Sequence, residues 1–266
     1  MPAQMATRVR FLGVAAYEIV SPRHRILIDP YLTGNPGAPC GPDDLETPDV
    51  ILVTHAAPDH LGDAFAIAKR TGAPVVCGAD VRALLLDQGL PSEQVRATVW
   101  GIVVEVGGVT VRPVECKHWS MATLSNGQVV SGVPLAFIVE PEEGVRIYHY
   151  GDTAVFDMRL IGDLYRPTVG LMGCCQPRAL QHLAPGAGRM ITGEMAPNEA
   201  ALVSEMLGLK LAVACHYSET DDPDVVEFLR LVPEHDSTGM RKALALEPGE
   251  VLVLDGESHH VEGAPR

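Results

Sequence analysis

The sequence is poor in positive charge and contains no long apolar run. Its 266 residues include 20 lysines and arginines against 34 aspartates and glutamates, which gives a formal net charge of −14. This excess repels phosphate backbones and anionic membrane surfaces, and no run of basic residues offsets it locally. No stretch approaches the roughly 18 apolar residues that a membrane-spanning helix requires. We therefore expect neither a nucleic-acid partner nor a membrane partner.

The sequence also lacks the cysteine spacing of a disulfide framework or of a C-x-x-C site. Hydrophobic residues make up 47% of the chain, so a large core can form without covalent help. Scattered thiols in a chain of this length are typical of a reducing compartment, and we expect a cytoplasmic protein. The first apolar segment is interrupted by Glu18, which favours a first β-strand over a secretion signal. The six cysteines are Cys40, Cys77, Cys116, Cys174, Cys175 and Cys215.

Short apolar runs bounded by Gly, Pro and Asp recur along the chain, and their length and β-branched content predict strands. Segments with helical periodicity lie between some of these runs, at 59–72, 196–209 and 222–232. Because no linker or change of composition divides the chain, we expect a single α/β domain over residues 1–266. The predicted strands are 25–29, 50–54, 73–78, 109–115, 134–140, 145–150, 169–173, 211–215 and 250–256.

Several predicted strands lead into a residue of a type that binds metals. These residues are His55, His118, Asp152 and His216. The carboxyl ends of strands meet at one edge of a sheet, where α/β proteins place their active sites. One such residue alone is usually structural, and Asp152 in a Gly-Asp-Thr sequence could cap a turn. Their agreement, beside the tight cluster of His55, Asp59 and His60, predicts a metal centre.

The segment THAAPDHLGD, residues 54–63, resembles the H-x-H-x-D-H signature of the metallo-β-lactamase superfamily. More widely, the chain resembles the small metal-dependent hydrolases related to ascorbate-6-phosphate lactonase, over residues 8–254. The segments that carry this resemblance are ILIDPYLTGNPG, ILVTHAAPDHLGDAFAIAKRTGA, YHYGDTAVFDMRLIGDLYRP and LEPGE. The resemblance implies an αββα sandwich, in which two mixed β-sheets pack face to face with helices outside and a metal site at one edge.

The resemblance also implies which residues would hold metal. In such families one ion is held by histidines alone, a second by an aspartate and two histidines, and a further aspartate bridges the two. The matching residues are His55 and His118 for the first site, Asp59, His60 and His216 for the second, and Asp152 for the bridge. Asp59 or Asp152 would then orient a water molecule and take its proton. His118 or His55 would stabilise the developing oxyanion or protonate the leaving group.

Two positions depart from the family pattern. Ala57 replaces the second histidine of the signature, and Val14 stands after Gly13 where a histidine is expected. A methyl group cannot bind a metal, so the first site loses a ligand, whereas the second keeps a nitrogen and oxygen set acceptable to zinc, manganese or iron. We favour one tightly held divalent ion, zinc or manganese, over two. In the other interpretation a different residue replaces the lost imidazole, the candidates being His182, Glu194, Cys174 and Cys175.

These observations predict a metal-dependent hydrolase, of lactonase or amidohydrolase type, that acts on a small molecule. A metal-activated hydroxide would attack the carbonyl of an ester, lactone or cyclic amide bond. The alternative, motivated by Ala57 and Val14, is a non-catalytic metal-binding protein that kept the fold. Related small enzymes often associate, so a homo-oligomer is an open expectation.

Other features have two interpretations each. Asp29 follows a predicted strand and is either a hydrogen-bond partner of a ligand histidine or a turn residue that ends the strand. The irregular segment 174–195, rich in Gly, Pro and Ala, is either a binding loop or a surface excursion. We interpret His149, which stands shortly before Asp152, as structural.

Overall fold

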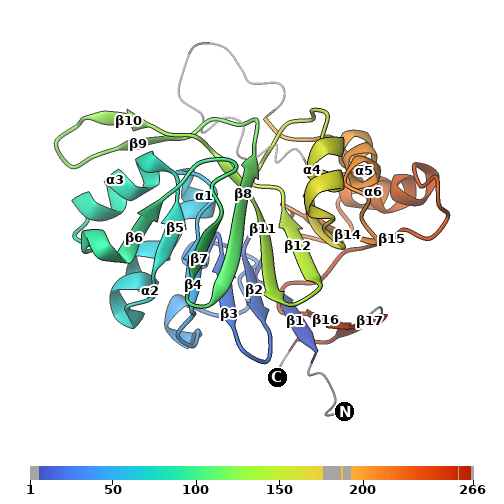
Figure 1. Cartoon of the computed structure of the whole chain (residues 1–266), viewed down its shortest axis with the longest axis horizontal. Helices are drawn as coiled ribbons and strands as arrows, with labels where there is room; N and C mark the ends of the chain where they lie inside the picture. Colours follow the sequence, from blue (N-terminus) through green and yellow to red (C-terminus); the bar gives the residue numbers. More distant parts are fainter. Residues whose placement is uncertain (1–5, 176–186, 188–192, 257, 265–266) are drawn as a thin grey trace.

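Two mixed β-sheets pack face to face in this chain, and helices cover the outer face of each sheet (Figure 1). The computed structural model describes residues 6–175, 187, 193–256 and 258–264. The arrangement is an αββα sandwich, which confirms the predicted fold class. None of the described helices is long and apolar enough to span a membrane.

The first sheet has eight strands and changes from antiparallel to parallel pairing at its middle. In spatial order they are β17 (Ser258–Glu262), β16 (Val251–Asp255), β1 (Thr7–Phe11), β2 (Tyr17–Val20), β3 (Arg25–Ile28), β4 (Val50–Leu52), β5 (Val75–Cys77) and β6 (Val95–Ala97). Neighbours from β17 to β3 pair antiparallel, and neighbours from β3 to β6 pair parallel.

The second sheet has seven strands and repeats this division. In spatial order they are β15 (Lys242–Leu244), β14 (Leu211–Cys215), β13 (Val169–Gly173), β12 (Val145–His149), β11 (Leu135–Glu142), β8 (Val109–Glu115) and β7 (Val104–Val106). Pairing is parallel from β15 to β12 and antiparallel from β12 to β7. A separate two-stranded ribbon consists of β9 (Met121–Thr123) and β10 (Val129–Ser131).

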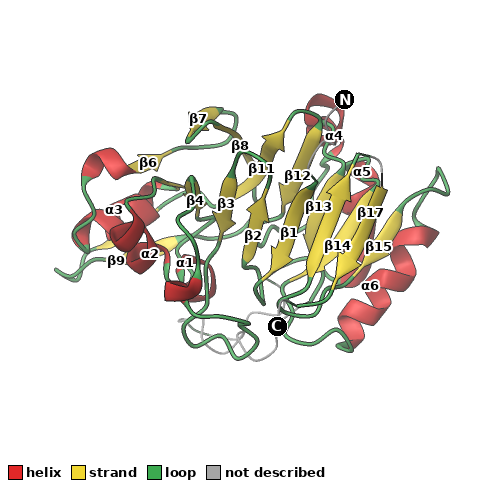
Figure 2. Cartoon of the chain, turned by 90° about the horizontal axis from the view of Figure 1, so that it is seen from below, coloured by secondary structure: helices red, strands yellow, loops and turns green. Residues whose placement is uncertain are grey.

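The helices fall into two groups on opposite sides of the strands. They are α1 (Pro58–Leu61), α2 (Ala64–Thr71), α3 (Ala79–Asp87), α4 (Arg159–Tyr165), α5 (Pro197–Met206) and α6 (Pro223–Glu234), with 3₁₀ turns at Pro42–Asp44 and Ser92–Gln94. Figure 1 and Figure 2 show α1, α2 and α3 on one side and α4, α5 and α6 on the other. Each sheet therefore has one face for its own helices and one for the other sheet.

Strand β3 shows how the alternation of side chains builds these two layers. Ile26 and Ile28 belong to the core between the sheets, whereas Leu27 belongs to the core between the first sheet and its helices. In β4, Val50 and Leu52 likewise face the second sheet, and Ile51 faces the helices. Successive side chains of a strand point to opposite faces, so strands buried on both faces are continuously apolar. This is the pattern that the predicted strands display.

The predicted strands are present: 109–115, 169–173 and 211–215 have the predicted bounds, and the others are shorter or shifted by one to three residues. The single helix predicted over 59–72 is wrong. The structure divides it into α1 and α2 at Gly62 and Asp63. Gly62 has a φ of +42°, and a Cβ there would lie 2.5 Å from Tyr31 Cα and closer still to the carbonyl of Pro30. Only glycine tolerates both the left-handed φ and the close backbone, so the chain turns here instead of continuing the helix.

Candidate metal centre

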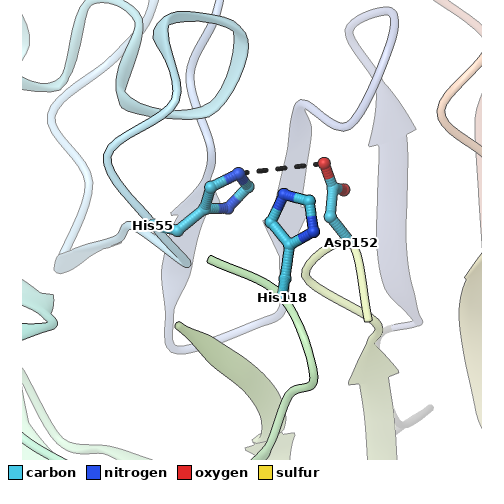
Figure 3. Close-up of side chains that lie close together, drawn as sticks. All are labelled: His55, His118 and Asp152. Carbon is cyan, nitrogen blue, oxygen red and sulfur yellow. Dashed lines mark ion pairs between the residues drawn. The ribbon is translucent and has the colours of Figure 1, made fainter. Parts of the chain in front are cut away.

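The predicted ligands converge at one edge of the sandwich, where strands of both sheets end. His55 follows β4 of the first sheet, and the other three residues follow strands of the second sheet. Those three are His118 after β8, Asp152 after β12 and His216 after β14. Figure 3 shows His55, His118 and Asp152 pointing toward one another, with the ion pair between His55 and Asp152 dashed. Asp59 and His60 join them from the short helix α1.

The carboxylate of Asp152 lies at the middle of this cluster. Its Oδ2 atom is 2.9 Å from Nε2 of His60, 3.5 Å from Nε2 of His216 and 3.8 Å from Nε2 of His55. Three imidazole nitrogens from three different segments thus face one carboxylate oxygen. Asp152 therefore lies between His55, which the resemblance assigned to the first site, and His60 and His216, which it assigned to the second.

The six candidate ligands form two adjacent groups that share no residue, and within each group the ligand atoms all lie within 4.8 Å of one another. One group consists of His55, His118 and Asp152, and the other of Asp59, His60 and His216. Between the groups, Nε2 of His60 lies 3.4 Å from Nε2 of His216. The six residues that the sequence predicted as ligands are therefore brought together.

The histidines of the first-sheet side are held through their Nδ1 atoms by a buried hydrogen-bond network. His60 Nδ1 lies 2.7 Å from Asp29 Oδ2, and the Thr54 hydroxyl donates to the same oxygen at 2.7 Å. Since that hydroxyl proton points to Asp29, His55 Nδ1 must donate to Thr54 Oγ1, which lies 3.0 Å away. The predicted hydrogen bond between Asp29 and a ligand histidine is confirmed. Both rings keep Nε2 free to face Asp152.

The histidines of the second-sheet side are held in the same way by two adjacent residues. His118 Nδ1 donates to the carbonyl oxygen of Gly193 at 3.0 Å. His216 Nδ1 lies 3.2 Å from the Oε2 atom of Glu194. Three of these imidazoles have Nδ1 hydrogen-bonded to the protein. The Nδ1 atom of His216 makes no hydrogen bond among the described residues, but it faces the Glu194 carboxylate as an ion pair. Contacts at Nδ1 orient metal-binding histidines.

Backbone strain gathers around the same residues. Asp29, Asp152 and His216 have φ values of +45°, +64° and +65°, and Val14 has +55°. A residue with a Cβ pays about 1–2 kcal/mol for this left-handed conformation. The backbone amide of His216 donates to the carbonyl of Val14 at 2.8 Å, so Val14 supports this turn. Such strained residues typically cluster at functional sites.

Negative charge dominates the electrostatics of the centre. Burial opposes protonation, but the carboxylates of Asp152 and Glu194 outweigh it and raise the pKa of His216 to about 10. Burial, together with the charge of Asp152, raises the pKa of Glu194 to about 8. Burial and the neighbouring His60 lower the pKa of His55 well below its usual value. The centre therefore attracts positive charge and keeps His55 neutral, as an electron-pair donor must be.

The donor atoms fit a divalent metal. His55 Nε2 and Asp152 Oδ1 are buried and accept or donate no hydrogen bond within the described part of the protein. Buried polar atoms without partners are rare, and a metal ligand is one accepted reason for them. Imidazole nitrogens mixed with carboxylate oxygens suit zinc, manganese and iron.

Ala57 contributes only its backbone to the centre. It is the residue before α1, and its carbonyl accepts from the amides of His60 and Leu61 at 3.0 and 2.8 Å. Glu194, a candidate for replacing the lost imidazole, lies against His216 and forms a third candidate group with His216 and Asp152, but it does not belong to the group of His55 and His118. Cys174 and Cys175 join neither ligand group, and His182 lies outside the described residues.

Some residues of the network were not predicted. Thr54 directly precedes His55, and Tyr150 stands two residues before Asp152; this proximity to predicted ligands was the available signal. Gly193 lies in the irregular segment, most of which lies outside the described residues, and nothing in its local sequence indicated a contact with His118. His149 is buried and its Nε2 donates to the carbonyl of Ala15 at 2.9 Å, in agreement with a structural role.

Comparison with known proteins identifies the family. The model of the β-lactamase superfamily domain matches residues 24–217 of the chain. The chain belongs to this superfamily. It is 40% identical over 252 residues to a UPF0173 metal-dependent hydrolase of Thermococcus onnurineus, covering 93% of this chain and 99% of that protein. A UPF0173 metal-dependent hydrolase of Methanopyrus kandleri is 38% identical, and the match covers 91% of this chain and 98% of that protein. Within the β-lactamase superfamily, the chain is thus a member of the UPF0173 family.

Solved structures of other proteins have the same fold. Igni18, described as a novel metallo hydrolase of Ignicoccus hospitalis, has a TM-score of 0.73 and 25% identity, with 95% of this chain and all of that chain covered. An isothiocyanate hydrolase from Delia radicum gut bacteria has a TM-score of 0.66 at 17% identity, with 94% and 100% covered. At 17% identity, the similarity to the isothiocyanate hydrolase shows a shared fold alone.

Proposed function

We propose that this chain is a metal-dependent hydrolase that cleaves an ester, lactone or amide bond of a small molecule. The observation that carries the proposal is the position of Asp152, whose Oδ2 atom faces Nε2 of His55, His60 and His216 at 2.9–3.8 Å. A carboxylate shared by imidazoles from both sheets is a place where a divalent ion would be held. The UPF0173 relatives are named metal-dependent hydrolases, which agrees with this chemistry.

We propose that one ion is held tightly, by Asp59, His60, Asp152 and His216, and that it is zinc or manganese, with iron as a further option. These residues retain two nitrogens and two oxygens, whereas Ala57 leaves the group of His55 and His118 without its third imidazole. When bound, a divalent ion lowers the pKa of a water molecule and polarises a carbonyl group.

The protein's own groups supply the proton transfers. The side chain of Asp59 is 20% exposed while that of Asp152 is 5% exposed, so Asp59 stands at the boundary between the buried centre and solvent. A carboxylate in this place can orient a water molecule and take its proton. His118, partly buried and fixed by Gly193, is placed to donate to a developing oxyanion or a leaving group.

We further propose a small-molecule substrate and no nucleic-acid partner, because of the net charge of −14. A cytoplasmic location agrees with the six cysteines, which are all free. A non-catalytic metal-binding protein is the second candidate, because Ala57 and Val14 remove two expected polar groups from the centre.

Metal content and turnover together test the proposal. Protein purified without added metal should hold about one ion per chain by elemental analysis, and His216→Ala should lose it. A panel of esters, lactones and amides should then be hydrolysed by the loaded wild type. Asp59→Asn should lower kcat by about 100-fold or more, while Asp43→Asn, a change at a 91%-exposed side chain, should not.

The outcomes separate the two candidates. Bound metal without turnover of any ester, lactone or amide would favour the non-catalytic protein. A chain that binds no zinc, manganese or iron, even after soaking, would overturn both the hydrolase and the metal-binding protein.

A further inference from the structure

The adjacent residues Gly193 and Glu194 contact one histidine from each ligand group. The carbonyl of Gly193 accepts from His118 Nδ1 at 3.0 Å, and Oε2 of Glu194 lies 3.2 Å from His216 Nδ1. Both contacts are made to the ring nitrogen that faces away from Asp152. One short stretch of chain therefore sets the orientation of two imidazoles that come from different strands.

The Glu194 carboxylate is itself fixed. Its Oε2 atom accepts a hydrogen bond from the hydroxyl of Tyr150 at 2.7 Å, and both side chains are buried. The Tyr150 ring lies directly against Gly173, where a Cβ would collide with it. The tyrosine hydroxyl thus has little freedom to move, and it holds the glutamate at a defined place behind His216.

His60 shows the same arrangement on the opposite side of the centre. Its Nδ1 lies 2.7 Å from Asp29, and the Thr54 hydroxyl fixes that carboxylate as Tyr150 fixes Glu194. Both histidines of the second ligand group therefore have a hydroxyl-anchored carboxylate behind Nδ1. Carboxylates in this place fix the ring and make Nε2 a stronger electron donor.

We propose that Glu194 is a positioning residue, whose carboxylate, anchored by Tyr150, holds His216 through Nδ1 so that Nε2 faces the metal centre. The inference rests on the proposed function, since it concerns the affinity of the same centre for metal. It also gives Glu194 a role other than replacement of the imidazole missing at Ala57.

Zinc affinity, measured by competition with a chromophoric chelator, tests this role. Glu194→Ala should weaken zinc binding by about 10- to 100-fold. Glu194→Gln, which keeps an acceptor oxygen of the same size in the same place, should weaken it less. Cobalt(II)-loaded Glu194→Ala should also show a shifted visible spectrum, because the orientation of His216 changes. Glu105→Gln, an exposed change on the edge strand β7, is the matched control and should leave both readouts unchanged.

The coupling between Tyr150 and Glu194 gives a second, independent test. Tyr150→Phe should weaken zinc binding in the wild-type background and weaken it less in Glu194→Ala, because part of its action passes through Glu194 and part through its hydrogen bond with Asp152. Tyr165→Phe, on α4, is the control for loss of a tyrosine hydroxyl.

Each outcome has one meaning. Wild-type zinc affinity in folded Glu194→Gln and Glu194→Ala, or an equal effect of Tyr150→Phe in both backgrounds, would overturn the positioning role. If Glu194→Ala does not fold, the zinc affinities of Glu194→Gln and Tyr150→Phe test the positioning role instead. A wild type that binds no metal would instead overturn the proposed function.

Discussion

Single residues at the centre combine an unfavourable backbone with a defined chemical task. Asp29, Asp152 and His216 all have positive φ values. The Asp29 carboxylate faces His60, and Asp152 and His216 face each other. A relaxed backbone at these strand ends would turn the side chains elsewhere. Surrounding hydrogen bonds, such as that from the His216 amide to the Val14 carbonyl, hold the strained conformation in place.

Restoring the missing imidazole should change the number of bound ions. Ala57 lies between His55 and Asp59, and its backbone role at the start of α1 does not depend on its side chain. We expect Ala57→His to raise the metal content from about one ion per chain to about two, since the first group would regain a third nitrogen. Elemental analysis of protein purified in parallel with wild type measures this.

A histidine introduced at the protein surface is the control for that measurement. Ala66 is exposed on α2, and Ala66→His should leave the metal content unchanged. Two ions in the wild type would contradict the expectation and show that another residue completes the first group.

Among the elements, α1 is short but carries two ligands. It begins at Pro58 and ends at Leu61, and a helix of four residues has little stability of its own. The turn after it is anchored instead, because the Asp63 carboxylate accepts from the amides of Leu32 and Thr33 at 3.0 and 2.8 Å. Docking of this turn onto the loop after β3 therefore places Asp59 and His60.

The close approach at Gly62 predicts a large effect of one methyl group. Gly62→Ala should destabilise the protein by about 2–4 kcal/mol, because the Cβ would meet the Pro30–Tyr31 backbone at a positive φ. Urea denaturation measures this. Gly72→Ala is the matched control, since φ is +75° there but no atom lies within 4 Å of the added Cβ. It should cost only about 1 kcal/mol, and equal losses in both variants would contradict the explanation.

Element prediction succeeded where burial on both faces makes a strand continuously apolar, as in β13 and β14. Prediction failed where the local composition is ambiguous, or where contact with a distant segment determines the backbone conformation. The helix predicted over 59–72 ignores Gly62, whose conformation depends on the loop at Pro30, 32 residues earlier (62 − 30). Helices α3 and α4 and the short edge strands β6 and β7 lack a clear period and were not predicted.

At the scale of the whole molecule, the centre joins the two sheets. His55 and His60 come from the first sheet's side, whereas His118, Asp152 and His216 follow strands of the second. A metal held by both sets would connect the halves of the sandwich at one edge. Binding to the folded chain alone stabilises it by mass action.

Removal of the metal should therefore lower the thermal stability. At a free zinc concentration about 1,000 times Kd, the stabilisation is about 4 kcal/mol, which corresponds to a fall in Tm of about 8–16 °C after chelation. Scanning calorimetry of the metal-free and reloaded protein measures the difference. His216→Ala should show little response to added zinc, and an equal rise in Tm for this variant would place the stabilising ion elsewhere.

The sequence, with its resemblance to a known family, indicated the fold class and the candidate ligands that the structure brings together. Apolar runs bounded by turn residues specify strands locally, and a ligand placed directly after a strand is carried to the sheet edge with it. The loss of an imidazole at Ala57 is likewise visible without coordinates, because it is a matter of residue chemistry.

Only the tertiary structure decided how those ligands are oriented. The contacts of His118 with Gly193 and of His216 with Glu194 join residues more than 20 positions apart, and no local pattern encodes such pairs. Asp29 could have been a turn residue until the fold placed it 2.7 Å from His60. Orientation depends on which segments pack together, and packing is a property of the whole chain.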